Sequence, residues 1–128
     1  MKQSLKIIKV NHFYLIHDGS RNGHPGLVFW KDDIANLYLA IKFGTTKNQN
    51  NASLKHPISK NIMNSYVYKK PLLLKRKDIG KELLNDIQIN INDFKIIEQI
   101  KKISPSFSKS VNRKSKRLFN YLSKKKTV

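Results

Sequence analysis

The stretch NLYLAIKF, from Asn36 to Phe43, decides the fold class of this chain. Its residues alternate between two sides, with Leu37, Leu39, Ile41 and Phe43 on one and Tyr38, Ala40 and Lys42 on the other. A period of two is typical of a half-buried β-strand. We therefore expect the odd-numbered stripe to lie in the core, packed against a helix that carries Phe94, Ile97 and Ile100. Tyr38 and Lys42 are then expected on the accessible face.

Strand-like segments lie on both sides of this stretch. Residues 6–17 are rich in Ile, Val, Phe and Tyr, and we expect one strand there, or two with a break near Asn11 and His12. Residues 26–30 predict a short strand that ends at Lys31-Asp32-Asp33. Residues 65–74 predict a further strand, in which Pro71 indicates an edge position or a bend. Turn-forming residues fill 18–23, and the polar segment 44–53 is expected to be a mobile loop.

Helices are expected only late in the chain. Phe94, Ile97, Ile100 and Ile103 recur every three residues, with acidic and basic residues at the ends that suit the helix dipole and with Pro105 as the stop. A second helix is predicted over about 110–123, with an apolar stripe of Val111, Ser115, Leu118 and Leu122. Strands followed by helices predict an α+β fold, a small, strongly twisted antiparallel sheet or barrel with C-terminal helices.

Charge is the most unusual property of the composition. The 128 residues include 26 Lys or Arg and 8 Asp or Glu, for a net charge of +18, and this length favours one domain. The last 24 residues hold eight of the bases and no acid, so we expect a body over 1–104 and a basic, helical tail over 105–128. The predicted partner is a polyanion, RNA or alternatively DNA.

Several classes of protein are disfavoured. With no Cys there is neither a disulfide nor a thiolate nucleophile. Apolar runs such as Leu72-Leu73-Leu74 are too short to cross a bilayer, and Lys6 and Lys9 interrupt any signal peptide, so we expect a cytoplasmic protein without a membrane partner. No phosphate-binding glycine loop occurs, and His12 and His17 fall on opposite faces of a strand, so we expect no cofactor and no metal.

A candidate site arises where two segments end. RNGHPGLV (21–28) is a loop that runs into a strand, and FGTTK (43–47) is a strand that runs into a loop. If the two strands are antiparallel neighbours, His24 meets Thr45 and Thr46, with Arg21 and Lys47 on either side. Neutral imidazole, which the basic surroundings favour, can take a proton from a ribose 2′-OH, while cations and hydroxyls stabilise the phosphoryl oxygens. A plainly structural, solvent-facing His24 is the alternative interpretation.

Further nucleic-acid contacts are expected outside this cleft. Tyr38 could stack on an unpaired base beside Lys42. The tail would contact phosphates through its bases Arg113, Lys114, Lys116 and Arg117. The alternative for these residues is a core tyrosine and a solvated, non-specific basic arm.

The layout resembles the MazF/PemK family of toxin endoribonucleases and the similar ToxN-type toxins, over about residues 5–103. HPGLV (24–28) stands where that family has Arg-Pro followed by a Val/Leu strand, and FGTT (43–46) resembles its Pro-x-Thr-Ser. SYV (65–67) and KDIG (77–80) resemble its Ser-x-Val and basic-x-x-Gly segments. The resemblance implies an SH3-like barrel, RNA cleavage to a cyclic phosphate and a 5′-OH, and an antitoxin protein or RNA as partner.

The chain departs from the family at the position that matters most, since His24 replaces the usual arginine. Either Arg21 supplies the missing cation or the activity is altered or lost. Two functions therefore stay open: a metal-independent toxin-type endoribonuclease, and a non-catalytic basic nucleic-acid-binding module of a phage, plasmid or mobile element. An inhibitor of a nucleic-acid enzyme is a weaker third, because such proteins are more often acidic. A homodimer is also left open.

Overall fold

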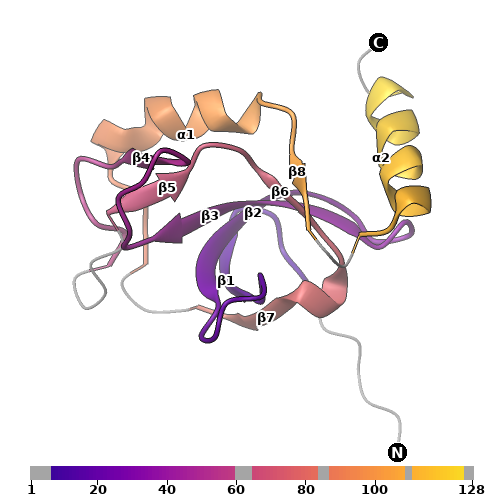
Figure 1. Cartoon of the computed structure of the whole chain (residues 1–128), viewed down its shortest axis with the longest axis horizontal. Coiled ribbons are helices and arrows are strands. Elements are labelled where there is room, and N and C mark those ends of the chain that lie inside the picture. The colour runs from indigo at the N-terminus through magenta and orange to yellow at the C-terminus, as the bar shows by residue number, and fades with distance from the viewer. Residues whose placement is uncertain (1–6, 60–64, 84–86, 109–110, 126–128) are drawn as a thin grey trace, which may run out of the picture.

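The computed structural model of the chain describes residues 7–59, 65–83, 87–108 and 111–125. The first seven strands precede the two α-helices, and the short strand β8 lies between the helices (Figure 1). The strands are β1 (His12–Ile16), β2 (His24–Asp32), β3 (Leu37–Gly44), β4 (Asn51–Ser53), β5 (Tyr66–Tyr68), β6 (Leu72–Leu74), β7 (Ile79–Glu82) and β8 (Ser106–Phe107). The helices are the 3₁₀ turns η1 (Arg76–Asp78) and η2 (Ile91–Asp93), with α1 (Phe94–Lys101) and α2 (Arg113–Lys125). The α+β class is therefore confirmed.

The strands form one mostly antiparallel sheet. Its order is β4-β5-β3-β2-β1-β7, with β6 on another part of β3 and β8 parallel to β6. The ladder has two ends and does not close among the described residues. The predicted single strand over 65–74 is wrong, because two strands flank Lys69 and Lys70. Pro71 lacks an amide hydrogen and cannot continue a regular ladder, which accounts for the break.

The β2–β3 hairpin forms the centre of the sheet. β2 is longer than the predicted 26–30 because both ends find partners: His24 pairs with Ile16, and Asp32 pairs with Leu37. In the turn, the Asp32 carboxylate accepts a hydrogen bond of 3.0 Å from the Ala35 amide, and Asn36 adopts a φ of 57°. Asn adopts that left-handed conformation more readily than most residues, so Asn36 is well suited to this position of the turn.

The segments around this hairpin follow the prediction in part. The expected break before β1 is confirmed by Asn11, whose φ is 68°, and residues 18–23 form no regular element. The predicted strand from residue 6 is shorter, and Lys6 itself lies outside the described residues. The polar segment 44–53 was expected to be a loop throughout, but Asn51–Ser53 pairs with β5 as β4.

Both faces of β3 are buried, which corrects the prediction of a half-buried strand. Ile41 and Phe43 pack with Ile97 and Ile100 of α1, as expected. Leu37 and the partly buried Leu39, on the same side, pack instead in a cluster with Phe119 of α2. Tyr38 and Ala40 lie in a third cluster on the opposite face, which includes Ile8, Tyr14, Ile16, Val28 and Leu74.

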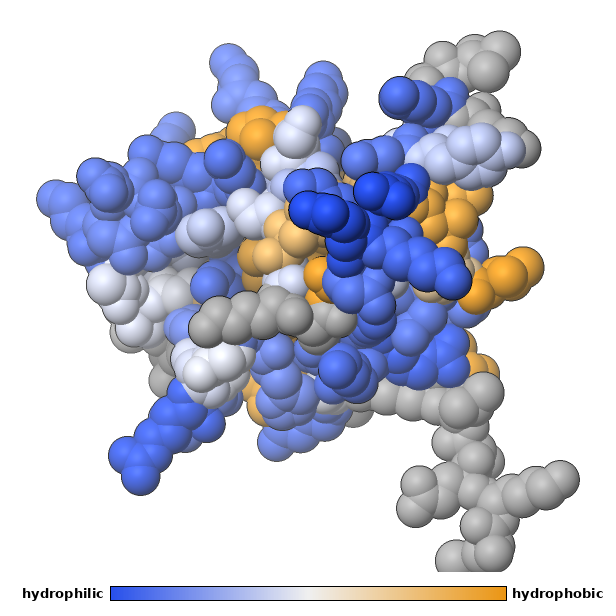
Figure 2. Space-filling view, turned by 45° about the vertical axis from the view of Figure 1, so that its right-hand side comes forward, coloured by the Kyte–Doolittle hydropathy of each residue, from blue (hydrophilic) through white to orange (hydrophobic). Residues whose placement is uncertain are grey.

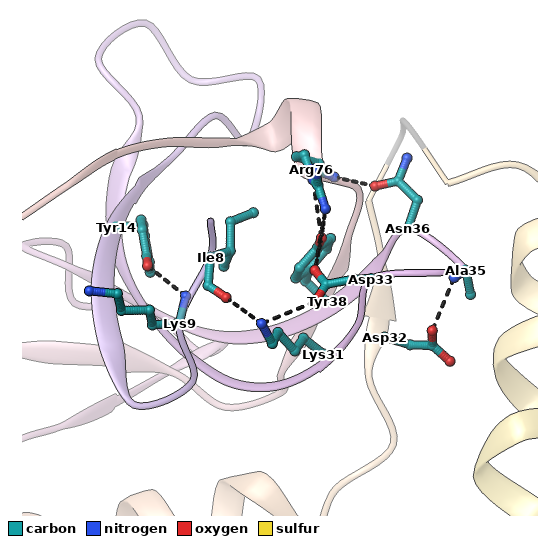
Figure 3. A network of polar contacts seen from close by, with 10 residues as sticks. All are labelled: Ile8, Lys9, Tyr14, Lys31, Asp32, Asp33, Ala35, Asn36, Tyr38 and Arg76. Atoms are coloured by element: carbon teal, nitrogen blue, oxygen red, sulfur yellow. Dashed lines mark hydrogen bonds and ion pairs between the residues drawn. The ribbon is translucent and has the colours of Figure 1, made fainter. Parts of the chain in front are cut away.

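Tyr38 is therefore not an accessible stacking platform, since its exposure is 0%. Its hydroxyl donates a 2.7 Å hydrogen bond to the Asp33 carboxylate and accepts hydrogen bonds from the Arg76 guanidinium at 3.0 and 3.2 Å (Figure 3). The hydrogen bond from Tyr38 lowers the pKa of Asp33, and burial raises the pKa of Tyr38. The network joins the β2–β3 turn to η1.

The two α-helices bury some residues other than those expected. Phe94 is 50% exposed, so it does not join Ile97 and Ile100 in the core. Val111 is buried as predicted, but in α2 Leu118 is 41% exposed whereas Phe119 is 6% exposed, so the predicted apolar stripe is wrong at Leu118. Residue 110, where this helix was predicted to start, lies outside the described residues.

Phe119 attaches α2 to the sheet. Its ring lies edge-on to Trp30 at 5.4 Å between centroids, and at 6.4 Å from Phe107 of β8. The segment after the expected domain boundary at 104 thus contributes both a strand and a packed helix. No helix among the described residues is long and apolar enough to span a bilayer.

Candidate functional site

The end of the β1–β2 connection positions His24. The loop 18–23 finishes at Gly23, whose φ is 68°. A β-carbon at Gly23 would lie 2.6 Å from the carbonyl oxygen of Ile16, so the chain can turn this tightly only with glycine. His24 then pairs with Ile16 at the start of β2. This pairing places the imidazole at the same end of the sheet as the last residues of β3.

A carboxylate orients the imidazole. The Nδ1 of His24 lies 2.8 Å from Oδ2 of Asp18, and the Lys42 ammonium lies 3.1 Å from the same oxygen. Asp18 also accepts hydrogen bonds from the Ser20 amide and hydroxyl. Burial opposes ionisation of Asp18, but the hydrogen bonds from Ser20 and Lys42 outweigh it and hold its pKa well below the usual range. The ionised carboxylate can only accept, so Nδ1 carries a proton, and Nε2 is the ring nitrogen that is not bonded to Asp18.

The imidazole borders a pocket of about 260 Å³, which we call the His24 pocket. A β-carbon at Gly44 would lie 3.6 Å from Cδ2 and 3.9 Å from Nε2 of His24, so this edge of the ring faces the end of β3. The remaining lining is polar or aromatic and includes Lys42, Thr46, Asn48, Asn50, Asn51 and Tyr68. An imidazole, a hydroxyl, an ammonium and amide groups therefore surround one small space.

The structure brings together three of the expected site residues: His24, Thr46 and Lys42 all line the His24 pocket. Thr45, Lys47 and Arg21 are exposed and do not line it. Arg21 lies in the 18–23 loop, so the expectation that it flanks His24 within the cleft is wrong. Lys42, on β3, is the cation that lies next to the imidazole, because its ammonium and Nδ1 of His24 contact the same Oδ2 oxygen of Asp18.

The expected nucleic-acid-binding residues of the tail lie on α2, far in sequence from the residues of the His24 pocket. Arg113, Lys114, Lys116 and Arg117 are all exposed on the helix. The face of the molecule in Figure 2 is mostly hydrophilic, with hydrophobic side chains confined to separate areas. The basic side of α2 is therefore accessible to a polyanion.

Sequence reasoning missed Asp18 and Tyr68. Asp18 was assigned only to a turn, although it is one of eight acids and lies six residues before His24, which was a usable signal. Tyr68 is partly buried and takes the place expected of Tyr38 beside Lys42, whose ammonium lies 4.8 Å from the centroid of its ring. Which of several strand tyrosines faces out depends on the curvature of the sheet, so the alternation in β3 could not identify it.

A second histidine–carboxylate pair lies elsewhere on the sheet. Nδ1 of His12 is 2.8 Å from Oε2 of Glu82, beside a larger pocket of about 590 Å³. That pocket is walled by α1 and β1 residues such as Phe13, Ile97 and the half-exposed Phe94. Its described lining residues include no hydroxyl side chain, and the one ammonium among them, that of Lys101, is bonded to Glu98. Within the described part of the chain, no group of three or more His, Asp or Glu residues could hold a metal ion.

Comparison with known proteins adds no relative: no family model, no curated protein and no solved structure matches the chain.

Proposed function

We propose that the chain is a metal-independent endoribonuclease of the toxin type, which cleaves single-stranded RNA by attack of the ribose 2′-OH. The observation that carries this proposal is the shared pocket of His24, Lys42 and Thr46, with Asp18 bonded to the far nitrogen of the imidazole. A carboxylate behind a histidine holds the ring in one tautomer and stabilises the imidazolium that forms during proton transfer.

The chemistry assigns a role to each group. Nε2 of His24 accepts the proton of the 2′-OH, and the resulting oxygen attacks the adjacent phosphorus. The Lys42 ammonium and the Thr46 hydroxyl donate to the phosphoryl oxygens, where negative charge accumulates. The bond to the 5′-oxygen breaks, and this oxygen takes a proton from water. The products are a 2′,3′-cyclic phosphate and a 5′-OH.

The same assignment explains how the chain could act without the family's arginine. Lys42 lies 3.1 Å from Asp18, which also bonds to His24, so a cation and the base are held by one carboxylate. Lys42 therefore takes the place that the sequence reasoning gave to Arg21. Neutralisation by an antitoxin protein or RNA belongs to this proposal, as does a cytoplasmic site of action.

We further propose that the curved sheet corresponds to an SH3-like barrel. The short turn η1 leads from β6, on β3, directly into β7, which pairs with β1 at the other side of the hairpin. The segment β6-η1-β7 thus runs from one side of the β1-β2-β3 unit to the other, around the cluster that contains Tyr38. An experimental structure in which the even-numbered side of β3 faces solvent would contradict this assignment.

The test compares two histidine variants. Purified protein is incubated in EDTA with end-labelled single-stranded RNA, and His24→Ala should lower the cleavage rate by about 10²- to 10⁴-fold. His12→Ala is the matched control, because His12 makes an equivalent 2.8 Å contact with a carboxylate outside the His24 pocket. It should leave the rate unchanged. A strand with 2′-deoxyribose at the cleavage position should not be cut. Equal losses in both variants, or cleavage that requires a metal, would contradict the proposal.

The alternative is a non-catalytic basic module that holds nucleic acid. It is favoured by the exposed cations of α2 and by the replacement of the family's arginine by His24. Under this alternative the same incubation gives binding of RNA without any product, and His24→Ala changes nothing. The comparison of wild type with His24→Ala therefore separates the two functions.

A further inference from the structure

A second pocket, of about 340 Å³, adjoins the His24 pocket. We call it the Phe107 pocket. Lys42 and Tyr68 line both pockets, so the two spaces lie on either side of one lysine–tyrosine pair. Asp18, which bonds to His24 and Lys42, also lines the Phe107 pocket. Any ligand in the Phe107 pocket is therefore next to the reacting groups proposed above.

The walls of the Phe107 pocket are unlike those of the His24 pocket. Phe107 of β8 and Leu72 of β6 supply apolar surface, and Tyr68 supplies an aromatic one. The hydroxyl-bearing Ser106 and Ser108 lie on either side of Phe107. A flat, apolar ligand with polar edges fits such walls, because it can stack on the rings and hydrogen-bond at its rim.

The two aromatic rings each have a lysine ammonium nearby. Lys42 lies 4.8 Å from the ring centroid of Tyr68, and Lys116 of α2 lies 4.7 Å from that of Phe107. A nucleotide combines a π-face with a negatively charged phosphate, and a strand repeats both at each step. Lys42, Tyr68 and Phe107 line the pocket, and Lys116 adjoins it through the Phe107 ring. Two aromatic–lysine pairs at one pocket match successive nucleotides better than they match a peptide or a lipid headgroup, and the net charge of +18 favours the same ligand.

We propose that the Phe107 pocket is a base-binding subsite that holds the unpaired base of the nucleotide next to the one cleaved. This inference rests on the proposed function for its position relative to the cleaved bond. Tyr68 separates the two subsites and stacks on the bound base, Lys42 contacts the intervening phosphate, and Lys116 leads the strand onto the basic face of α2. The substrate is then an unpaired strand of at least two nucleotides, because paired bases cannot enter the pocket.

The test measures binding, so that it does not depend on cleavage. The probes are a fluorescein-labelled 2′-O-methyl 12-mer of uridine, which lacks the attacking hydroxyl, and an abasic 2′-O-methyl strand of the same length and charge. Wild type should bind the strand with bases about 5- to 150-fold more tightly, the effect expected of one stacked base. Both strands present the same phosphates, so electrostatic binding cancels in this ratio.

Two variants block the subsite in different ways. Ser106→Trp fills the pocket, while the Ser106 amide keeps its backbone bond to the Pro71 carbonyl, and Ser106→Ala is its control. Tyr68→Leu removes the stacking ring, and Tyr68→Phe keeps it. Ser106→Trp and Tyr68→Leu should each bring the ratio close to one without weakening the binding of the abasic strand. The two controls should keep the wild-type ratio. Circular dichroism confirms that each variant folds.

The outcomes separate this inference from the proposed function. If wild type shows no preference for bases, or if the preference survives in both Ser106→Trp and Tyr68→Leu, the subsite is overturned even where His24 cleaves RNA. If the preference depends on Ser106 and Tyr68 but His24→Ala shows that no cleavage occurs, the subsite stands as a binding site and the catalytic proposal fails. Loss of the preference in His24→Ala alone would place the base in the His24 pocket and overturn the subsite.

Discussion

Replacement of Phe119 by alanine tests whether α2 is part of the fold or a free arm. The ring of Phe119 is 6% exposed and lies edge-on to Trp30 and Phe107. Truncation of a buried phenylalanine costs about 3–5 kcal/mol, which includes the loss of aromatic pairs worth about 0.5–1.5 kcal/mol each. Since domains of this size are stable by only about 5–15 kcal/mol, Phe119→Ala should remove a large part of the free energy of unfolding.

Leu118→Ala is the matched control, one residue away on the same helix. Leu118 is 41% exposed, so its truncation should change the free energy of unfolding by less than about 1 kcal/mol. The apolar stripe read from the sequence predicts the opposite order, with Leu118 buried. The pair of variants therefore distinguishes the sequence prediction from the structure.

The protein contains its own probe for this measurement. Trp30 is the only tryptophan, and its ring centroid lies 5.4 Å from that of Phe119. Urea unfolding followed by Trp30 fluorescence and by circular dichroism gives the free energy for each variant. Phe119→Ala should also shift the native emission to longer wavelength, because water reaches the indole. A cost for Leu118→Ala equal to or above that for Phe119→Ala, or coincident native spectra for wild type and Phe119→Ala, would refute the docking of α2.

Two further predictions concern charge. The pKa of Asp18 is lower in the folded protein than in the unfolded chain, so its ionised carboxylate stabilises the fold above about pH 4, and this stabilisation is lost as the pH falls further. Asp18→Asn should therefore lower the free energy of unfolding near neutral pH and lower it less near pH 2, as urea unfolding at both pH values would show. An equal effect at both pH values would contradict the assigned ion pairs. Replacing the exposed Arg113, Lys114 and Arg117 by Gln should lower the log–log salt slope of single-stranded RNA binding by up to about 2, since each phosphate contact contributes about 0.7; an unchanged slope in fluorescence anisotropy titrations would show that α2 does not contact the strand.

Local sequence signals determined most of the elements. The alternation in NLYLAIKF predicted β3, the turn-formers at 18–23 predicted a loop, and the apolar repeat after Asp93 predicted α1. These signals are reliable because they depend on neighbours along the chain: side chains alternate in a strand, and helix ends select particular residues. The pairing of β2 with β3 also followed from their short connection, and it brought His24 and Thr46 to one pocket as predicted.

The alternation could not determine how many faces of β3 are covered. Periodicity separates two sides of a strand, but an aromatic residue such as Tyr38 is compatible with either water or a core. The covering of its side by Ile8, Val28 and Leu74 depends on contacts between segments that are distant in sequence. The place of Tyr68 at the His24 pocket depends on the same kind of contact, since β5 pairs with the end of β3 and with β4.

Only the tertiary structure decided which charges act together. Asp18 and Lys42 are 24 residues apart. Lys42 and His24 share the Oδ2 oxygen of Asp18 because β1, β2 and β3 are antiparallel neighbours in one register. Arg21, although closer to His24 in sequence, lies outside the pocket. Composition determines that a chain of this charge attracts a polyanion, because long-range electrostatics sums over all residues. The position of a histidine, a lysine and an aromatic ring around one pocket depends on angstrom-scale geometry, which the chain acquires only on folding.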